Sequence, residues 1–319
     1  MDIKSYLEEK RGFINVYLKA YFASTMLPDA LYKSITYSLF AGGKRIRPIL
    51  ALASYEACDG HAQDILPQAA ALELIHTYSL IHDDLPSMDD DDLRRGQPTN
   101  HKVFGEAIAI LSGDALLTEA FFMMSNMQSH DARSTMHDTG EEYHNHREHS
   151  PKYSSPITCR LLLRALSEVA FASGIRGMVG GQAQDILAEN SEPDKETLDF
   201  IHLHKTAALI AASVRIGPIL ADSGTGRLNA LTRYGESIGL AFQIVDDLLD
   251  VEGTTRELGK PVGSDRKKRK LTYPSLYGID VARKKAEDCL TEALHALKEF
   301  SSSADPLREI AHYLVLRRH

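Results

Sequence analysis

Two clusters of aspartate carry the chemistry that this sequence suggests most directly. The segment 83–92 holds six aspartates within ten positions, directly after an apolar stretch, and DDLLD at 246–250 ends a second apolar run. Carboxylates this close repel one another unless a cation lies between them, and their hard oxygen atoms suit Mg²⁺ that also binds phosphate. Two such clusters could hold one diphosphate between them. The alternative for either cluster alone is a solvated acidic surface, but isolated charges at the ends of apolar helices are costly without partners.

The two clusters need different local structure to converge. On a helix, Asp246 and Asp250 lie one turn apart on the same face, with Asp247 at its border. In the first cluster, Pro86 lacks a backbone N–H and its ring opposes the carbonyl four residues earlier, so we expect a break or bulge near Asp83. Without that break, Asp83 and Asp89 would point to different sides.

Basic residues accompany the first cluster. GGKRIRP at 42–48 combines two glycines with three cations, which suits the wrapping of backbone and side chains around a phosphate. Arg94 and Arg95 follow the aspartates and add two guanidinium groups beside the expected metal. Charge balance for the aspartates is the simpler explanation of this arginine pair taken alone.

The elements that must position these side chains are helices. Apolar residues recur at three-to-four spacing, strand alternation is absent, and Gly and Pro punctuate the intervals, so we predict an all-α fold in a single domain spanning 1–319. The segment 129–155 is polar and rich in histidine, and we interpret it as an insertion; metal binding there is the alternative, although the spacings are irregular. The predicted helices are Ile65–His82, Ala107–Met127, Cys159–Ala188, Leu198–Leu220, Leu228–Glu252 and Ser275–Phe300.

Composition narrows the class of protein. The 44 acidic residues exceed the 36 basic ones, for a net charge of -8, which argues against a protein that coats nucleic acid. The three cysteines are far apart and odd in number, so neither a disulfide framework nor a cysteine-rich zinc site is expected. No apolar stretch resembles a signal peptide core or reaches the length of a membrane span, so we expect a cytoplasmic protein.

A series of motifs then suggests a family. GGKRIRP, HTYSLIHDDLPSMDDDDLRRGQP, GDALL, GGQAQDI, HKTAAL, GLAFQIVDDLLD, LGKPVGSD and KLTYP follow one another between roughly Ala20 and Phe300. In this series the chain resembles the trans-isoprenyl diphosphate synthases, and among them the bacterial-type enzymes, whose two aspartate-rich motifs are DDxxxxD and DDxxD. The resemblance implies an isoprenoid synthase helical bundle around a deep cavity, a homodimer and isoprenyl diphosphate substrates. It also implies dependence on Mg²⁺, with three ions per active site, or on Mn²⁺ as the alternative.

The resemblance also implies roles for individual residues. Gln182 and Asp185 match a motif that faces the metals, and Asp247 and Lys205 match catalytic positions. The metal ligands by this likeness are Asp83, Asp84, Asp89, Asp246 and Asp250. The residues that would hold the allylic diphosphate are Arg94, Lys205, Thr206, Gln243 and Lys260, and those that would hold isopentenyl diphosphate are Lys44, Arg47, His76 and Arg95.

Three residues before the first cluster can also be judged on helix geometry. His76 lies seven residues before Asp83 and so on nearly the same face, although a lone histidine in an apolar helix is more often a core residue. Tyr78 and Ser79 lie about 6 to 8 Å along the helix from Asp83. In resembling enzymes an aromatic residue at the position of Tyr78 marks farnesyl producers; the alternative is a plain core tyrosine.

The expected reaction is the condensation of dimethylallyl and geranyl diphosphate with isopentenyl diphosphate to give farnesyl diphosphate. A geranylgeranyl or longer-chain synthase would share every metal and diphosphate residue. A terpene cyclase would carry Asn, Ser and Glu in its second metal motif, where this chain has DDLLD. A non-catalytic subunit of a heteromeric synthase would keep the fold and lose ligands.

Overall fold

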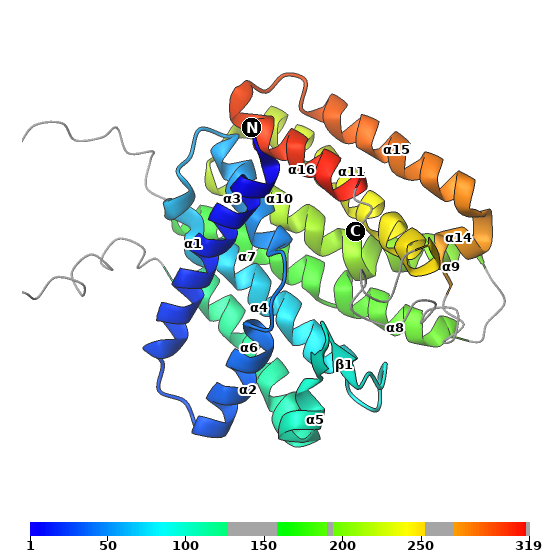
Figure 1. The fold of residues 1–319 in the computed structure, drawn as a ribbon. Helices are drawn as coiled ribbons and strands as arrows, with labels where there is room; N and C mark the ends of the chain where they lie inside the picture. The colour runs from blue at the N-terminus through cyan, green and yellow to red at the C-terminus, as the bar shows by residue number, and fades with distance from the viewer. Residues whose placement is uncertain (127–157, 190–193, 253–270, 317–319) are drawn as a thin grey trace, which may run out of the picture.

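The fold is a bundle of helices with one short hairpin (Figure 1). A computed structural model describes residues 1–126, 158–189, 194–252 and 271–316, so the predicted insertion at 129–155 and Lys260 lie outside the described residues. The elements are α1 (Ile3–Ala23), α2 (Asp29–Leu39), α3 (Ile46–Glu56), η1 (Ala62–Ile65), α4 (Leu66–Asp83), β1 (Leu93–Arg94), β2 (Gln97–Pro98), α5 (Asn100–Phe104), α6 (Glu106–Ser125), α7 (Cys159–Ser173), α8 (Met178–Ala188), α9 (Lys195–Ile201), η3 (His202–Ala207), α10 (Ala208–Leu220), α11 (Gly224–Glu252), α14 (Tyr273–Tyr277), α15 (Ile279–Ala296), η4 (Ser302–Ala304) and α16 (Asp305–Val315).

Helix α10 forms the centre of the bundle. It packs against α3, α7 and α11, while α4 packs along α6 and α11 along α15. Most of its side chains are buried, and a Cβ added at Gly217 would lie 2.1 Å from Ser54 Oγ on α3. Only glycine therefore allows the backbones of α3 and α10 to approach this closely. This close contact fixes α10 against α3.

The all-α prediction is confirmed, and most predicted helices agree with the structure to within a few residues. Helix α4 ends at Asp83, where Pro86 predicted a break, and α11 runs through the whole second cluster. Two predictions of a single helix were wrong: the segment 159–188 breaks into α7 and α8, and the segment 275–300 breaks at Gly278, whose φ is 85°. Because that backbone angle favours glycine, the chain turns there between α14 and α15.

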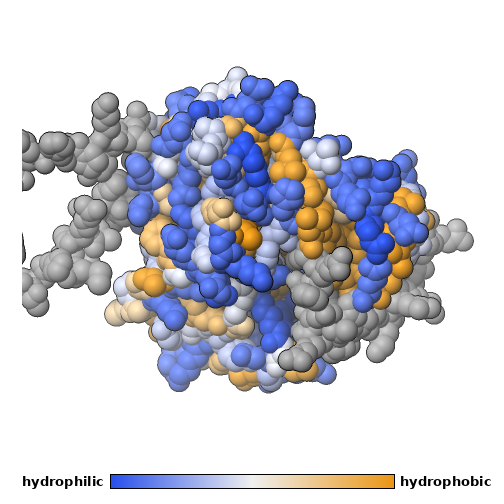
Figure 2. Space-filling model, turned by 45° about the horizontal axis from the view of Figure 1, so that its top comes forward, coloured by the Kyte–Doolittle hydropathy of each residue, from blue (hydrophilic) through white to orange (hydrophobic). Residues whose placement is uncertain are grey.

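Helix α6 is the most apolar long helix. It has 20 residues, and an 18-residue window within it has a mean hydropathy of 1.6. Among the described residues it alone is long and apolar enough to cross a membrane, by length and composition only. It packs along α4 within the bundle, and core helices of globular proteins meet the same criteria. Leu111 and Phe122 nevertheless stay 54% and 58% exposed. By contrast, the face drawn in Figure 2 is mostly hydrophilic, with hydrophobic side chains in a few stripes.

Candidate active site

A cavity of about 580 Å³ opens where α4, α8, η3 and α11 meet. Asp83 at the end of α4 and Asp246 on α11 both line it, so the structure brings one aspartate of each cluster to the same cavity. Its apolar lining includes Met88, Met178 and Phe242. The cavity therefore combines a charged end with a surface suited to a hydrocarbon chain.

The first cluster changes direction directly after α4. The backbone N–H of Asp89 donates to the carbonyl of Asp83 at 2.8 Å, so the chain loops back upon the helix end. Asp84 turns the other way: it is 3% exposed and accepts from Arg94 Nε at 2.6 and 2.9 Å. Burial raises the pKa of the Asp84 carboxyl, although its bonds to Arg94 oppose that rise. The two neighbouring aspartates thus have different surroundings.

Four cationic side chains line the cavity with the aspartates: Arg47, Arg94, Arg95 and Lys205. Lys205 donates to Asp185 at 2.6 Å, and Arg95 donates to the carbonyl of Gly42. Arg47 Nε is buried and has no hydrogen-bond partner among the described residues. A buried donor without an acceptor is costly, so an anionic ligand is the natural partner for this guanidinium.

Of the three cations in GGKRIRP, only Arg47 reaches the cavity. Arg45 is 3% exposed and forms an ion pair with Glu73 at 2.7 Å, which holds the start of α3. Lys44 is exposed, and its Nζ lies 5.7 Å from the ring centroid of Tyr313. Within this motif, Arg45 therefore stabilises the fold, whereas Arg47 lines the cavity.

His76, Tyr78 and Ser79 line the same cavity from α4. Burial, and then the neighbouring Arg47 and Arg95, lower the pKa of His76 well below its ordinary value of 6.5. Tyr78 is 6% exposed, and its ring packs edge-on against His82 with centroids 5.7 Å apart. Burial, with a smaller effect of Asp83, raises the pKa of Tyr78 to about 12, so its hydroxyl stays protonated.

Lys205 and Thr206 lie in η3, a six-residue π-helical segment. Two glycines allow neighbouring helices to approach its backbone: a Cβ at Gly181 would lie 2.2 Å from Lys205 N, and one at Gly239 would lie 2.8 Å from Ala207 Cα. Thr206 Oγ1 donates to Gln243 Oε1 at 2.7 Å. π-Helical turns often occur at functional sites. Here α8 and α11 hold the segment from two sides, at Gly181 and Gly239.

The donor set fits Mg²⁺ if a phosphate completes the coordination. Among the described residues, no three His, Cys, Asp or Glu side chains already stand close enough to hold a metal. Asp83 on α4 and Asp246 on α11 both line the cavity and would supply oxygen ligands. Mg²⁺ in phosphate sites typically takes one or two carboxylates together with phosphate oxygens and water. The aspartates would therefore bind the metal together with a diphosphate.

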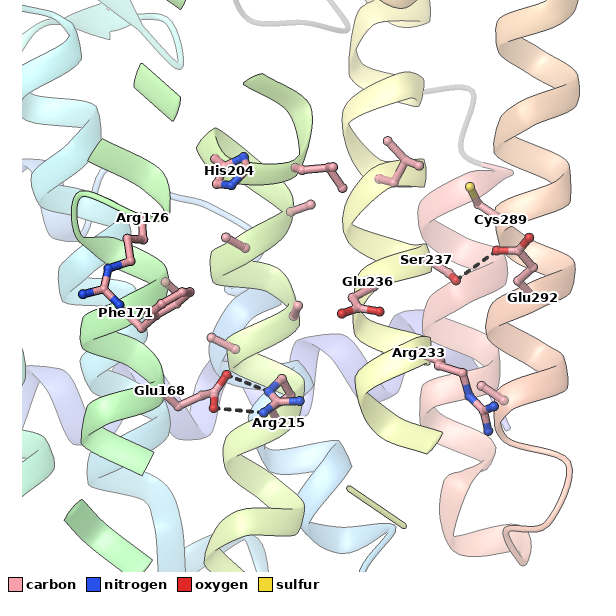
Figure 3. Close-up of a pocket in the computed structure, with 18 of the residues that line it drawn as sticks. Glu168, Phe171, Arg176, His204, Arg215, Arg233, Glu236, Ser237, Cys289 and Glu292 are labelled. Carbon is pink, nitrogen blue, oxygen red and sulfur yellow. Dashed lines mark hydrogen bonds and ion pairs between the residues drawn. The ribbon is translucent and has the colours of Figure 1, made fainter. Parts of the chain in front are cut away.

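A larger hollow of about 850 Å³ lies elsewhere, between α7, α10, α11 and α15 (Figure 3). Glu168 pairs there with Arg215 at 2.6 Å, and Arg233, Glu236 and Glu292 add charges of both signs. Burial raises the pKa of Cys289 to about 11, so its thiol stays protonated. Because this hollow contains no aspartate cluster, its size does not make it the better candidate for diphosphate chemistry.

Of the remaining predicted residues, Asp247 and Asp250 lie outside the cavity lining, whereas Gln182 is part of it. Asp247 and Asp250 are each 3% exposed within α11. Gln182 lines the cavity, and its buried Oε1 has no hydrogen-bond partner in the described part of the chain. The sequence analysis did not identify His202, which is buried beside Asp247. The one feature of the sequence that could have indicated it is its position three residues before Lys205.

The pKa of His76 predicts a pH dependence of stability. The folded protein keeps His76 neutral, whereas the unfolded chain takes up a proton below about pH 6.5, so acid should favour unfolding. Below that pH, the free energy of unfolding should fall by up to about 1.4 kcal/mol per pH unit more in the wild type than in His76→Gln. Urea unfolding at pH 7.5 and 5.5 measures this difference. The exposed His61→Gln is the control, and parallel pH profiles for wild type and His76→Gln would contradict the prediction.

Comparison with known proteins agrees with the geometry. The polyprenyl synthetase family profile matches residues 28–147 and 159–313. The chain is 42% identical over 317 residues to a farnesyl diphosphate synthase of Bacillus subtilis, covering 99% of both proteins, and 44% identical over 293 residues to a geranylgeranyl diphosphate synthase of Cyanophora paradoxa, covering 92% of this chain and 89% of that protein. The crystal structure of an FPP/GFPP synthase from Zymomonas mobilis has a TM-score of 0.78 and 35% identity, covering 98% of this chain and 99% of that one. This chain belongs to the polyprenyl synthetase family of prenyltransferases.

Proposed function

We propose that this protein is a farnesyl diphosphate synthase, which extends dimethylallyl and then geranyl diphosphate with isopentenyl diphosphate. Tyr78 carries this proposal: it lines the cavity five residues before Asp83, about 7.5 Å along α4. A prenyl chain whose diphosphate is bound at Asp83 would reach the ring of Tyr78 after a short distance. The Bacillus subtilis relative bears the same name.

The cations and aspartates of the cavity suit the first step, in which the allylic C–O bond breaks and negative charge moves onto the diphosphate. Mg²⁺ bound at Asp83 and Asp246 would supply Lewis-acid stabilisation of that charge. Lys205 and Arg94 would hold the diphosphate by charge-assisted hydrogen bonds in a preorganised site. Met178 and Phe242 would keep water from the allylic cation.

The second step forms the carbon–carbon bond. We propose that Arg47 and the neutral His76 bind the diphosphate of isopentenyl diphosphate. The buried Nε of Arg47, which lacks a hydrogen-bond partner among the described residues, supports this role. The double bond of isopentenyl diphosphate then attacks the allylic carbon, and one proton leaves the adduct. The released diphosphate, still held beside Lys205, accepts that proton.

A geranylgeranyl synthase is the second candidate, because the Cyanophora paradoxa relative at 44% identity carries that name. The two functions differ in product length alone. Incubation with labelled isopentenyl diphosphate and each of dimethylallyl, geranyl and farnesyl diphosphate separates them. A farnesyl synthase consumes the first two starters and leaves farnesyl diphosphate unextended.

Replacement of Tyr78 tests what limits the product. Tyr78→Ala removes the ring from the cavity wall, so we expect products longer than C15 in mass spectrometry. Tyr78→Phe keeps the ring and should keep the C15 product. An unchanged distribution in Tyr78→Ala would exclude Tyr78 as the limit.

Replacement of Asp246 tests the metal site. Asp246→Asn removes one charged oxygen ligand and should lower kcat/KM by about 10²- to 10³-fold. Asp222→Asn is the control, because Asp222 is exposed and pairs with Arg160 at 3.2 Å away from the cavity. Treatment with EDTA should stop wild-type turnover and added Mg²⁺ should restore it. Full activity in EDTA would refute a metal requirement.

We also propose that the protein is a cytoplasmic homodimer that pairs through α6. Leu111, Thr118 and Phe122 fall on one exposed stripe of that helix, and the exposed Leu163 lies on the adjacent α7. None of the three cysteines, all of which lie within the described residues, forms a disulfide, which suits a reducing compartment.

The double variant Leu111→Glu/Phe122→Glu should convert the dimer to a monomer in light scattering. Val281→Glu is the control, because Val281 is 54% exposed on α15, away from α6 (Figure 1). A wild-type protein that is already monomeric would exclude the dimer. A double variant that remains dimeric would exclude this surface.

A further inference from the structure

A chain of contacts runs from the cavity into the interior between η3 and α11. Thr206 Oγ1 donates to Gln243 Oε1 at 2.7 Å, and Gln243 Nε2 donates to Asp247 Oδ1 at 2.8 Å. Asp247 Oδ2 accepts from the backbone N–H of Tyr273 at 2.9 Å and lies 3.2 Å from His202 Nε2. Each residue therefore orients the next, from the buried His202 to the cavity wall.

The surroundings of Asp247 suit a supporting role. Asp247 is 3% exposed and does not line the cavity, although it directly follows Asp246, which does. Both of its carboxylate oxygens already have contacts within the protein. A buried carboxylate that lost one of these contacts would be free to turn, and Gln243 would lose its fixed acceptor.

His202 is the inner end of this chain. It is 2% exposed, and its ring stacks on Tyr273 with centroids 5.7 Å apart and planes inclined by 22°. Nδ1 is buried without a hydrogen-bond partner among the described residues, so the polar contact of the ring is made by Nε2 toward Asp247. The amide of Gln243 can then present its oxygen to Thr206 only while its nitrogen faces Asp247.

We propose that His202 is a positioning residue for the allylic diphosphate site, acting through Asp247 and Gln243 on Thr206. This inference rests on the proposed function, in which Thr206 and Gln243 hold the allylic diphosphate. Residues that support a binding group from behind commonly change affinity or activity by about 10- to 100-fold when they are lost. The effect should fall on the allylic substrate, because Arg47 and His76 lie on α3 and α4, outside this chain of contacts.

Two amide substitutions separate positioning from packing. His202→Gln places a nitrogen at about the reach of Nε2, whereas His202→Asn reaches only as far as Nδ1 and leaves Asp247 without this contact. We expect His202→Asn to raise the KM for geranyl diphosphate about tenfold while the KM for isopentenyl diphosphate stays within twofold. In His202→Gln the KM for geranyl diphosphate should stay near the wild-type value. Tyr273→Phe should leave both KM values unchanged, because Tyr273 contacts Asp247 through its backbone N–H.

Calorimetry with inorganic diphosphate and Mg²⁺ provides a readout independent of turnover, and urea unfolding checks that each variant is folded. Weaker diphosphate binding in His202→Asn than in His202→Gln supports the positioning role. Equal behaviour of the two amide variants, or an equal rise of both KM values, overturns it. If His202→Asn does not fold, His202→Phe takes its place, because it keeps a ring against Tyr273 and removes Nε2. A raised KM for geranyl diphosphate alone in His202→Phe supports the positioning role, and unchanged KM values overturn it. A wild type without prenyl transfer refutes the proposed function instead.

Discussion

Repulsion between carboxylates is the constraint on which the rest of this structure depends. Asp83 and Asp246 line one cavity from opposite helices, and more aspartates stand beside each of them. In a poorly solvated cleft such charges are stable only when cations or donors face them. The protein supplies these partners unevenly: Asp84 pairs with Arg94 and Asp185 with Lys205. Asp247 instead accepts hydrogen bonds from Gln243 and from the backbone N–H of Tyr273, and it lies beside His202. Counter-charges are thus arranged so that the cavity itself suits a metal and a diphosphate.

Rigid packing behind the site keeps these charges in place. Ion pairs alone would let long side chains move, because exposed pairs contribute little. Here the backbone of η3 is held between α8 and α11 at Gly181 and Gly239, where no Cβ would fit. Lys205 and Thr206 therefore project from a segment that has little freedom to shift. The same principle operates at α10, which crosses α3 at Gly217.

The sequence predicted α4, α6, α11 and the two acidic ends well, because apolar periodicity and Pro86 act locally. It could not predict the π-helical segment, since a wider turn is imposed by neighbouring helices rather than by residue spacing. It also could not distinguish Asp84 from Asp83, or Asp247 from Asp246: adjacent residues point about 100° apart, and the burial of one depends on partners far along the chain, such as Arg94 and Tyr273. The segment 159–188 looked like one helix because its apolar pattern continues across Gly174 and Gly177. A Cβ at Gly177 would lie 2.0 Å from the carbonyl oxygen of Ala172, so this turn also depends on a close approach that spacing does not reveal.

Relatives named as farnesyl and as geranylgeranyl diphosphate synthases both share over 40% identity with this chain. The function proposed above accounts for this if product length depends on fewer residues than the reaction does. The diphosphate end of the cavity requires many charged groups held by at least four elements, and few substitutions there leave the charges balanced. The hydrocarbon end requires only space. Because α4 carries Asp83 and Tyr78 on one rigid helix, the distance between the reacting carbon and the ring follows from helix geometry, about 1.5 Å per residue. A change from a large to a small side chain at one position can therefore lengthen the cavity without disturbing any charge. Under the proposed function, the charged end of the cavity therefore determines the reaction, whereas the space beside Tyr78 determines the product length.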